Sequence, residues 1–203
     1  MSENIKVPGA SDYYPIDSIK MLRLYIREDM NRMGGNKFIN PFRWLMGEDR
    51  SRMKLYIYVL RILEYVNNKR KCAWGGVKYI WCIVYFILLF CHRRQCFKYG
   101  VHIDPGVCDY GLRIAHPGGI HINANHVGKY CSITQGVVLG KKDNNENRPW
   151  VGDNVHFTLG CKVIGKVFIG NNVVVCQNSV VIKDLKDNVM ASGVPINIIK
   201  ERV

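Results

Sequence analysis

The sequence predicts a mainly β solenoid preceded by an α-helical N-terminal region. Two columns of side chains in the C-terminal half predict the solenoid, because one apolar residue recurs in steps of six and a small or β-branched residue follows it four positions later. A period of six is neither helical nor that of a simple strand, and it is typical of stacked coils. The leading column comprises Val127, Ile133, Leu139, Val151, Phe157, Val163, Ile169, Val175 and Val181. The second column comprises Cys131, Val137, Val155, Cys161, Val167, Val173 and Ser179.

Glycine directly follows the leading column at four positions, Gly128, Gly140, Gly152 and Gly170. We expect these glycines at sharp corners, where the chain needs backbone angles that other residues disfavour.

The hexads VGKYCS, ITQGVV, VGDNVH, VIGKVF and IGNNVV resemble the repeats of left-handed parallel β-helix acyltransferases. Four motifs are similar to those of serine acetyltransferases and the related polysaccharide O-acetyltransferases: AHPGGI at 115–120, TQGVVLG at 134–140, NRPWVGDNV at 147–155 and ASGVP at 191–195. The resemblance covers residues 99–200. It implies a left-handed triangular prism, acetyl-CoA as acyl donor without a metal, and a homotrimer or a dimer of trimers.

Three segments are expected along the chain: a helical region over 1–98, the left-handed β-helix over 99–190, and a C-terminal turn and tail over 191–203. Apolar residues at helical spacing predict a helix over 19–33, with Asp17 or Ser18 as its cap and glycine at 34–35 as its stop. A short helical turn is expected to begin at 40–41. A second amphipathic helix begins near Met53 and fades at 67–68.

Positive charge is concentrated in the N-terminal half. Residues 1–100 hold 18 Lys and Arg against 8 Asp and Glu, and residues 101–203 hold 11 against 8. Within the basic half, residues 79–91 form an unbroken apolar run flanked by Lys and Arg. A helix of that length spans about 20 Å, short of the roughly 30 Å of bilayer hydrocarbon. Two interpretations of residues 72–98 remain: a helix buried in an oligomer, and a helix lying on an anionic membrane surface.

Composition narrows the function classes. The 8 cysteines form no metal-like CxxC pair, and two of them occupy the small-residue column, which is typical of a reducing compartment. The N-terminus lacks the pattern of a secretory signal, so we expect a cytoplasmic protein, peripheral to the inner face of the membrane if residues 72–98 meet lipid. Nucleic-acid binding is not expected, because no recognition motif accompanies the basic residues.

His116 is the candidate catalytic residue. It lies in AHPGG, where proline and two glycines interrupt the repeat and leave room for a substrate near the backbone. Imidazole suits removal of a hydroxyl proton at neutral pH. The resemblance implies the same role, because the corresponding histidine is the general base of related acetyltransferases.

The other histidines have simpler interpretations. His92 belongs to a basic flank and His102 to the entry into the β-helix, whereas His121, His126 and His156 are expected to face solvent. Neither the spacing of the histidines nor a carboxylate partner predicts a metal site.

The acceptor site departs from the serine acetyltransferase pattern. That family has Asp directly before the catalytic His, where this chain has Ala115, and its later loop carries Arg-His where this chain has Asn147 and Arg148. Asn147 and Arg148 are therefore the candidate acceptor-binding residues, with Arg148 able to hold an anion from a shifted position. These changes favour a saccharide hydroxyl over L-serine.

The loop at 141–150 interrupts the hexads with charged and amide side chains. It is either a surface excursion or an arm that reaches a neighbouring subunit and closes the active site. Lys141 and Lys142 in this loop, and Lys200 and Arg202 near the C-terminus, are the candidate partners of the coenzyme A phosphates. The sequence thus predicts an acetyl-CoA-dependent O-acetyltransferase acting on a saccharide. Serine O-acetyltransferase is the first alternative, and a non-catalytic β-helix scaffold is the second.

Overall fold

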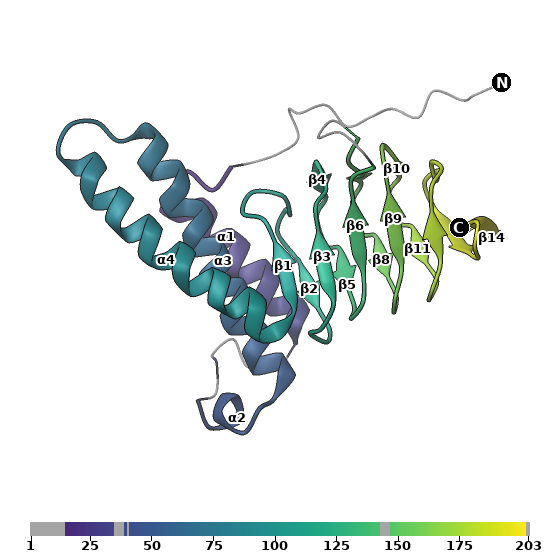
Figure 1. The fold of residues 1–203 in the computed structure, drawn as a ribbon, viewed down its shortest axis with the longest axis horizontal. Coiled ribbons are helices and arrows are strands. Elements are labelled where there is room, and N and C mark those ends of the chain that lie inside the picture. The colour runs from purple at the N-terminus through teal and green to yellow at the C-terminus, as the bar shows by residue number, and fades with distance from the viewer. Residues whose placement is uncertain (1–14, 35–38, 40, 143–146, 202–203) are drawn as a thin grey trace.

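The computed structural model describes residues 15–34, 39, 41–142 and 147–201, and it consists of a helical region at one end of a three-sided prism of short strands (Figure 1). The helices are α1 (Ile19–Met33), α2 (Pro41–Leu45), α3 (Asp49–Cys72) and α4 (Val77–Tyr99). Helix α3 packs between α1 and α4, and α4 leads directly into the prism.

The predicted caps of α1 are confirmed, whereas α3 runs past its predicted end. Ser18 accepts a hydrogen bond from the Met21 N–H at 3.2 Å, and Gly34 follows the last turn with φ at 70°. The side chains of the two asparagines that were expected to end α3 form hydrogen bonds with other groups instead. Asn67 accepts a hydrogen bond from Arg70 at 2.9 Å, and Asn68 donates one to the Ile16 carbonyl at 3.2 Å. Their side chains do not compete for the local backbone, so α3 continues to Cys72.

Helix α4 is longer than the apolar run inside it, with 23 residues against thirteen. It ends where Gly100 adopts a left-handed conformation with φ at 61°, and strand β1 starts one residue later. At about 1.5 Å per residue the helix is roughly 34 Å long.

Fourteen strands follow the helices in the described residues, and the first thirteen wind around the prism. They are β1 (Val101–Ile103), β2 (Arg113–Ile114), β3 (Ile120–Ile122), β4 (His126–Val127), β5 (Ser132–Ile133), β6 (Val138–Gly140), β7 (Trp150–Val151), β8 (His156–Phe157), β9 (Lys162–Ile164), β10 (Phe168–Ile169), β11 (Val174–Val175), β12 (Val180–Val181), β13 (Val189–Ser192) and β14 (Asn197–Glu201). The parallel sheets have the orders β1-β3-β6-β9-β12, β4-β7-β10 and β2-β5-β8-β11-β13, and β14 pairs antiparallel with β13. The fold is the predicted left-handed parallel β-helix.

Both predicted columns lie inside the prism. Every residue of the leading column and of the second column is at most 3% exposed. Neighbouring coils place like positions in register, as in the pairing of Ile133 with Phe157 and of Phe157 with Val175. The continuous apolar core down the axis follows from this register, because each coil covers the apolar face of the next.

The glycines after the leading column have a different role from the one predicted. Gly128 and Gly152 do not have positive φ, and the left-handed corner positions belong to Tyr130 and asparagines such as Asn154, with φ at 57° and 55°. A Cβ on Gly128 would collide with Asp153 Oδ1 and would lie 2.6 Å from the Gly152 carbonyl. Glycine is needed here because the next coil approaches closely, not because of backbone angles.

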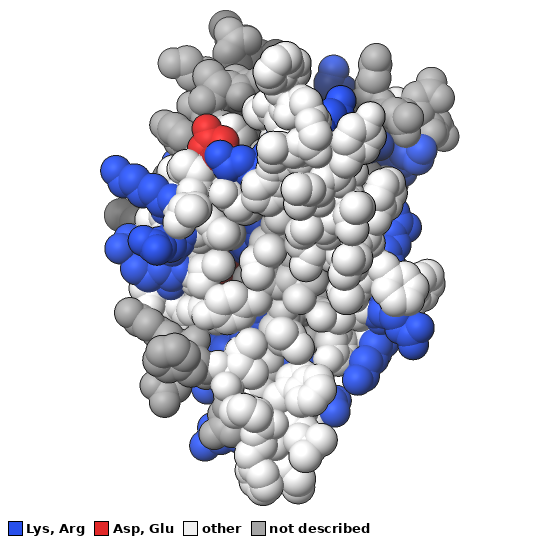
Figure 2. Space-filling view, turned by 90° about the vertical axis from the view of Figure 1, so that its left-hand side faces the viewer, with Lys and Arg blue, Asp and Glu red and all other residues white. Residues whose placement is uncertain are grey.

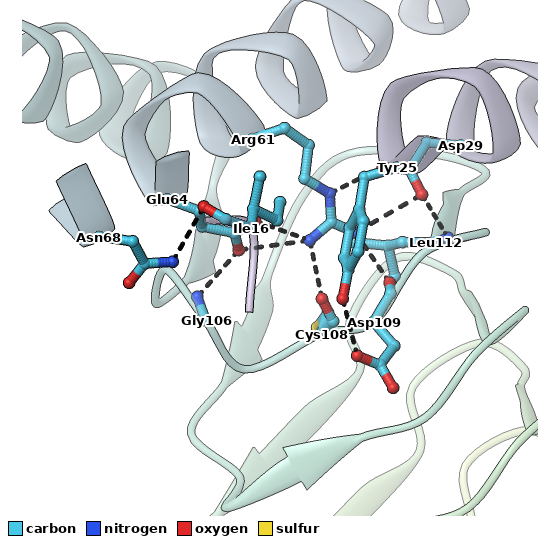
Figure 3. Close-up of polar contacts among 10 residues, drawn as sticks. All are labelled: Ile16, Tyr25, Asp29, Arg61, Glu64, Asn68, Gly106, Cys108, Asp109 and Leu112. Atoms are coloured by element: carbon cyan, nitrogen blue, oxygen red, sulfur yellow. Dashed lines mark hydrogen bonds and ion pairs between the residues drawn. The ribbon is translucent and has the colours of Figure 1, made fainter. Parts of the chain in front are cut away.

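A buried polar network fixes the helices to the first coil (Figure 3). Arg61 of α3 is fully buried and lies 2.7 Å from Asp29 of α1 and 3.0 Å from Glu64. Its guanidinium also donates to the carbonyls of Cys108 and Asp109 in the first coil, at 2.7 and 2.8 Å. The two carboxylates and the two backbone carbonyls together provide the guanidinium with ion pairs and hydrogen bonds. Without them, burying this cation would be energetically costly.

The two carboxylates of this network also hold the backbone of the first coil. Asp29 accepts a hydrogen bond from the Leu112 N–H at 2.8 Å, and Glu64 accepts one from the Gly106 N–H at 2.8 Å. The helical region is therefore attached rigidly to the prism, which sets the position of α3 relative to the first corners.

Candidate active site

His116 lies on the turn between β2 and β3, at a corner of the prism. Gly118 and Gly119 follow it with φ at 108° and 65°, which explains why the AHPGG segment needs two glycines. The His116 side chain is 62% exposed, so a substrate can reach the imidazole.

The start of α3 brings a carboxylate to this imidazole. Asp49, in the first turn of α3, has its Oδ2 atom 3.6 Å from the Nδ1 atom of His116. A carboxylate beside Nδ1 favours the tautomer that leaves Nε2 as proton acceptor. The pair has the arrangement of a general base and its orienting group.

A pocket of about 530 Å³ opens beside the pair. It is lined by Met33, Gly47, Glu48, Asp49, Arg50, Arg113, Ile114, Ala115 and His116. Two carboxylates and two guanidiniums thus face the same space. A hydrogen bond from Ser51, with Oγ 2.5 Å from the carboxylate, lowers the pKa of Glu48, which favours its negative charge. A pocket with both signs of charge suits a ligand that carries both.

A second groove of about 420 Å³ lies on the other side of the same turn. Pro117, Gly118, Gln135, Gly136, Leu159, Gly160 and Asn178 line it. Glycines from successive coils stack at this corner, and a Cβ on Gly136 would lie 3.3 Å from the Gly160 Cα. The stacked glycines leave backbone exposed along the prism, which suits a narrow, extended ligand. Lys162 donates a hydrogen bond from Nζ to the Gly136 carbonyl and adds a cation beside the groove.

Asn147 and Arg148 lie at a different corner, between β6 and β7. The Asn147 carbonyl accepts a hydrogen bond from the Lys142 N–H at 3.1 Å, and the Arg148 carbonyl accepts one from Asn125 at 3.4 Å. Neither residue lines the pocket around His116 in the described part of the chain. A single chain therefore does not bring the candidate acceptor-binding residues to the candidate base.

The candidate coenzyme A lysines are also separate from His116. Lys141 and Lys142 are exposed directly after β6, and Lys200 is exposed on β14. None of the three is among the described residues that line the two grooves. Arg202 lies outside the described residues.

Two of the remaining histidines differ from their predicted surroundings. His92 is 4% exposed on the side of α4 that faces α3, with its ring 5.3 Å from that of Tyr56. His126 is 9% exposed, and its Nε2 lies 3.6 Å from a carboxylate oxygen of Asp109. Both are packed between elements that meet only in the folded chain. The solvent-facing prediction was therefore wrong for His126, and the basic flank assigned to His92 did not indicate its burial.

The other three histidines, all in the prism, are less enclosed. His121 is exposed, as predicted, whereas His102 and His156 are half-buried. Among the described residues, no group of three or more His, Cys, Asp or Glu side chains could hold a metal ion.

Sequence reasoning missed Asp49, Glu48, Arg50 and Arg113. The first three belong to a helix start more than sixty residues before His116, so only tertiary packing brings them to it. Arg113 could have been identified from the sequence, because it is the outward-facing residue of the strand directly before AHPGG. Lys162 was missed for the same reason as Asp49, since its partner Gly136 lies on the neighbouring coil.

Two curated relatives cover much of the chain. The serine acetyltransferase of Synechococcus elongatus is 32% identical over 157 residues, which are 66% of this chain and 64% of the relative. The serine acetyltransferase of Staphylococcus epidermidis is 30% identical over 143 residues, which are 64% of this chain and 67% of the relative. The chain spans about half to two thirds of the length of the curated relatives it matches. No family model matches it.

Solved structures share the fold at lower identity. Serine acetyltransferase from Brucella abortus in complex with coenzyme A aligns with a TM-score of 0.63 and 18% identity, covering 93% of this chain and 71% of that one. Serine acetyltransferase from Neisseria gonorrhoeae in complex with serine aligns with a TM-score of 0.63 and 20% identity, covering 88% and 69%. The prism with its helical region thus defines a hexapeptide-repeat acyltransferase fold. By its curated relatives, the chain belongs to the serine acetyltransferase family.

Proposed function

We propose that the protein transfers an acetyl group from acetyl-CoA to the hydroxyl of L-serine. The observation that carries this proposal is the pocket in which His116 and Asp49 lie beside a second carboxylate and two guanidiniums. L-Serine presents an ammonium, a carboxylate and a hydroxyl within a few bonds of one another. A neutral sugar can only form hydrogen bonds with these groups and carries no charge to pair with them, so the pocket favours the amino acid over the neutral form of the saccharide expected from the sequence.

The pocket also supplies what Ala115 lacks. We propose that Asp49 and Glu48, which come from α3 and the residue before it, take the role of the aspartate missing before His116, because both line the pocket beside Ala115. These carboxylates can pair with the ammonium, and Arg113 or Arg50 can hold the carboxylate by its planar fork.

In the proposed reaction, the Nε2 atom of His116 accepts the serine hydroxyl proton as the oxygen bonds to the acetyl carbonyl carbon. The bond from that carbon to sulfur then breaks, and the thiolate takes the proton from the imidazolium. Asp49 keeps the imidazole oriented through both proton transfers. Typical general-base contributions are about two to four orders of magnitude in rate.

The glycine-lined groove is the proposed position of the donor. A Cβ on the stacked glycines would narrow it, and the turn that carries His116 forms one of its walls. An extended thioester arm lying there would end next to the base, with Lys162 beside it. The serine acetyltransferase from Brucella abortus, which shares this fold, binds coenzyme A, and this supports coenzyme A as the ligand class.

Asn147 and Arg148 can take part only if another chain supplies them, because they lie at a different corner from His116. We therefore propose that the loop at 141–150 acts across a subunit seam in a trimer. Lys141 and Lys142 would then approach the donor of the neighbouring chain, and Lys200 and Arg202 remain alternative phosphate contacts.

The test is acetyl-CoA consumption by the purified protein with L-serine, compared with nucleotide-linked and lipid-linked sugars. His116→Ala should abolish turnover, whereas His121→Ala, at an exposed position outside both grooves, should retain it. Turnover of sugars without turnover of L-serine would replace the proposal with the saccharide alternative. Absence of turnover with every acceptor, together with no thermal shift on adding coenzyme A, would favour the scaffold.

A further inference from the structure

One face of α4 is apolar and uncovered along the whole helix. Its exposed apolar residues are Val77, Tyr79, Ile80, Ile83, Val84, Phe86, Ile87, Phe90 and Phe97, each at least 36% exposed. The opposite side packs on α3 through half-buried and buried residues such as Trp81, Tyr85 and His92. The helix therefore already has its protein partner on one side, and the uncovered side is large for a soluble domain.

Helix α2 extends this face beyond the C-terminal end of α4. Phe42, Leu45 and Met46 are about 70% exposed, at 69, 72 and 72%. The Lys98 ammonium lies 5.9 Å from the centre of the Trp44 ring, which places α2 against α4. Together, α4, Phe42 and Leu45 of α2, and Met46 directly after α2 form what we call the apolar face.

Cations border the apolar face at both ends. Lys71 and Lys78 are exposed near the start of α4, and Arg93, Arg94 and Lys98 are exposed near its end. The sequence contains no Asp or Glu between positions 64 and 104. Figure 2 shows this side of the molecule as an uncharged band with Lys and Arg along its edges, and acidic side chains are scarce in its described part.

Tryptophan lies near both ends of the apolar face as well. Trp74 is 91% exposed just before α4, and Trp44 lies at the other end beside a groove of about 680 Å³. In that groove, Trp44 Nε1 and Gln95 Oε1 are buried and have no hydrogen-bond partner among the described residues. The exposed ring of Trp74 and the cations beside the apolar surface match the composition that the headgroup level of a membrane favours, whereas the polar atom of Trp44 is buried.

From these observations we propose that the apolar face docks on a membrane containing anionic lipids, with α4 in the plane of the surface. Helix α4 is long and apolar enough to cross a bilayer, but α3 lies along it and carries the network of Arg61, Asp29 and Glu64. Crossing the membrane would take that network into hydrocarbon. Lying flat places only the apolar face in the acyl region and the cations at the phosphates.

Charge complementarity favours the membrane over a two-fold symmetric pair of chains joined through the apolar face. In a symmetric pair of chains joined through this face, cations would face cations in either direction of α4, because both ends are basic. Anionic headgroups neutralise both ends at once. The inference does not depend on acetyl transfer, and failure of either proposal leaves the other intact.

The test uses the full chain and vesicles of phosphatidylcholine, with and without phosphatidylglycerol, in a co-sedimentation assay. The wild type should sediment with anionic vesicles at least tenfold more strongly than with neutral ones, and added salt should weaken the binding. Ile83→Glu with Phe90→Glu should abolish sedimentation. Ile182→Glu, at a 60% exposed apolar site on the prism, is the matched control and should bind as the wild type does.

A second pair of variants tests the electrostatic contribution to vesicle binding. Arg94→Ser should weaken binding to anionic vesicles, whereas Lys166→Ser, which removes an exposed cation from the prism, should not. Sedimentation velocity without vesicles gives the oligomeric state of each variant. The proposal would be overturned if the wild-type protein does not bind anionic vesicles, or if the variant with Ile83→Glu and Phe90→Glu binds them as the wild type does. Loss of oligomer in that variant, together with no vesicle binding by the wild type, would also overturn it and would make the face a protein interface.

Discussion

The Nδ1 atom of His116 lies 3.6 Å from the Oδ2 atom of Asp49, although the two residues belong to the β-helix and to the helical region respectively. The helical region is therefore part of the candidate active site and does more than cover one end of the prism.

Replacement of Asp49 by Asn should reduce kcat at least tenfold, because the amide does not fix the tautomer and orientation of His116 as the carboxylate does. The KM for acetyl-CoA should stay near the wild-type value. Steady-state kinetics with both substrates checks this. Both side chains are largely exposed, at 62% and 47%, so the melting temperature should not change. An Asp49→Asn enzyme with the kcat of the wild type would show that the pair is not part of the reaction.

Replacement of Arg61 by Met should destabilise the protein by about 3–5 kcal/mol, because Asp29 and Glu64 would remain buried without their cation. Chemical denaturation measures the change. Arg27→Met is the matched control, since Arg27 pairs with Glu28 at 3.0 Å but is 59% exposed. That control should cost no more than about 0.5 kcal/mol. Equal losses in the two variants would contradict the role assigned to the buried network.

His92 should make the folded state sensitive to acid. Burial lowers the pKa of His92 to about 4, from an ordinary value of 6.5. Below pH 6.5 the unfolded chain gains a proton at this position and the folded chain does not. The contribution of His92 to the free energy of unfolding is therefore fully present above about pH 6.5. It is lost progressively as the pH falls toward 4, by up to about 3 kcal/mol.

The His92→Gln variant isolates this contribution. Denaturation of wild type and variant at several pH values between 4 and 7 gives two curves of unfolding free energy. Their difference should change with pH over the window set by the two pKa values of His92. A constant difference would mean that His92 titrates alike in the folded and unfolded chains.

Two glycines at equivalent repeat positions should respond differently to alanine. In Gly128→Ala the new Cβ would meet the backbone of Gly152 at 2.6 Å, and we expect a loss of about 1–3 kcal/mol. In Gly140→Ala the nearest atom is Ile164 Cδ1 at 3.2 Å, the end of a flexible side chain that can move. Thermal melts of the two variants provide the comparison, and similar melting temperatures would exclude close coil packing as the reason for Gly128.

The sequence predicted those parts of the structure that repeat. The inward columns follow from the hexad period, and the helix caps at Ser18 and Gly34 follow from local rules. The pocket around His116 could not be predicted in this way. Asp49 and Arg113 meet there because Arg61 fixes α3 to the first coil, and no period or motif records that contact.

The burial of His92 and His126 could not be predicted from the sequence for the same reason. Each has polar or charged neighbours in the sequence, yet each is enclosed by an element that arrives from elsewhere in the chain. The sequence favoured a saccharide acceptor because Ala115, Asn147 and Arg148 depart from the serine acetyltransferase pattern, and the pattern does not record the carboxylates that α3 brings beside Ala115.

The stacking of coils gives the prism a modular length. Each coil contacts only the coils above and below it, and neighbouring strands lie about 4.8 Å apart. Adding one complete turn of three hexads beyond Asn178, the last residue that lines the glycine-lined groove, would shift β14 by that spacing along the axis. The corner that carries His116 and the groove beside it would keep their geometry. The reach of the C-terminal end can thus change in fixed steps without a change in the candidate active site.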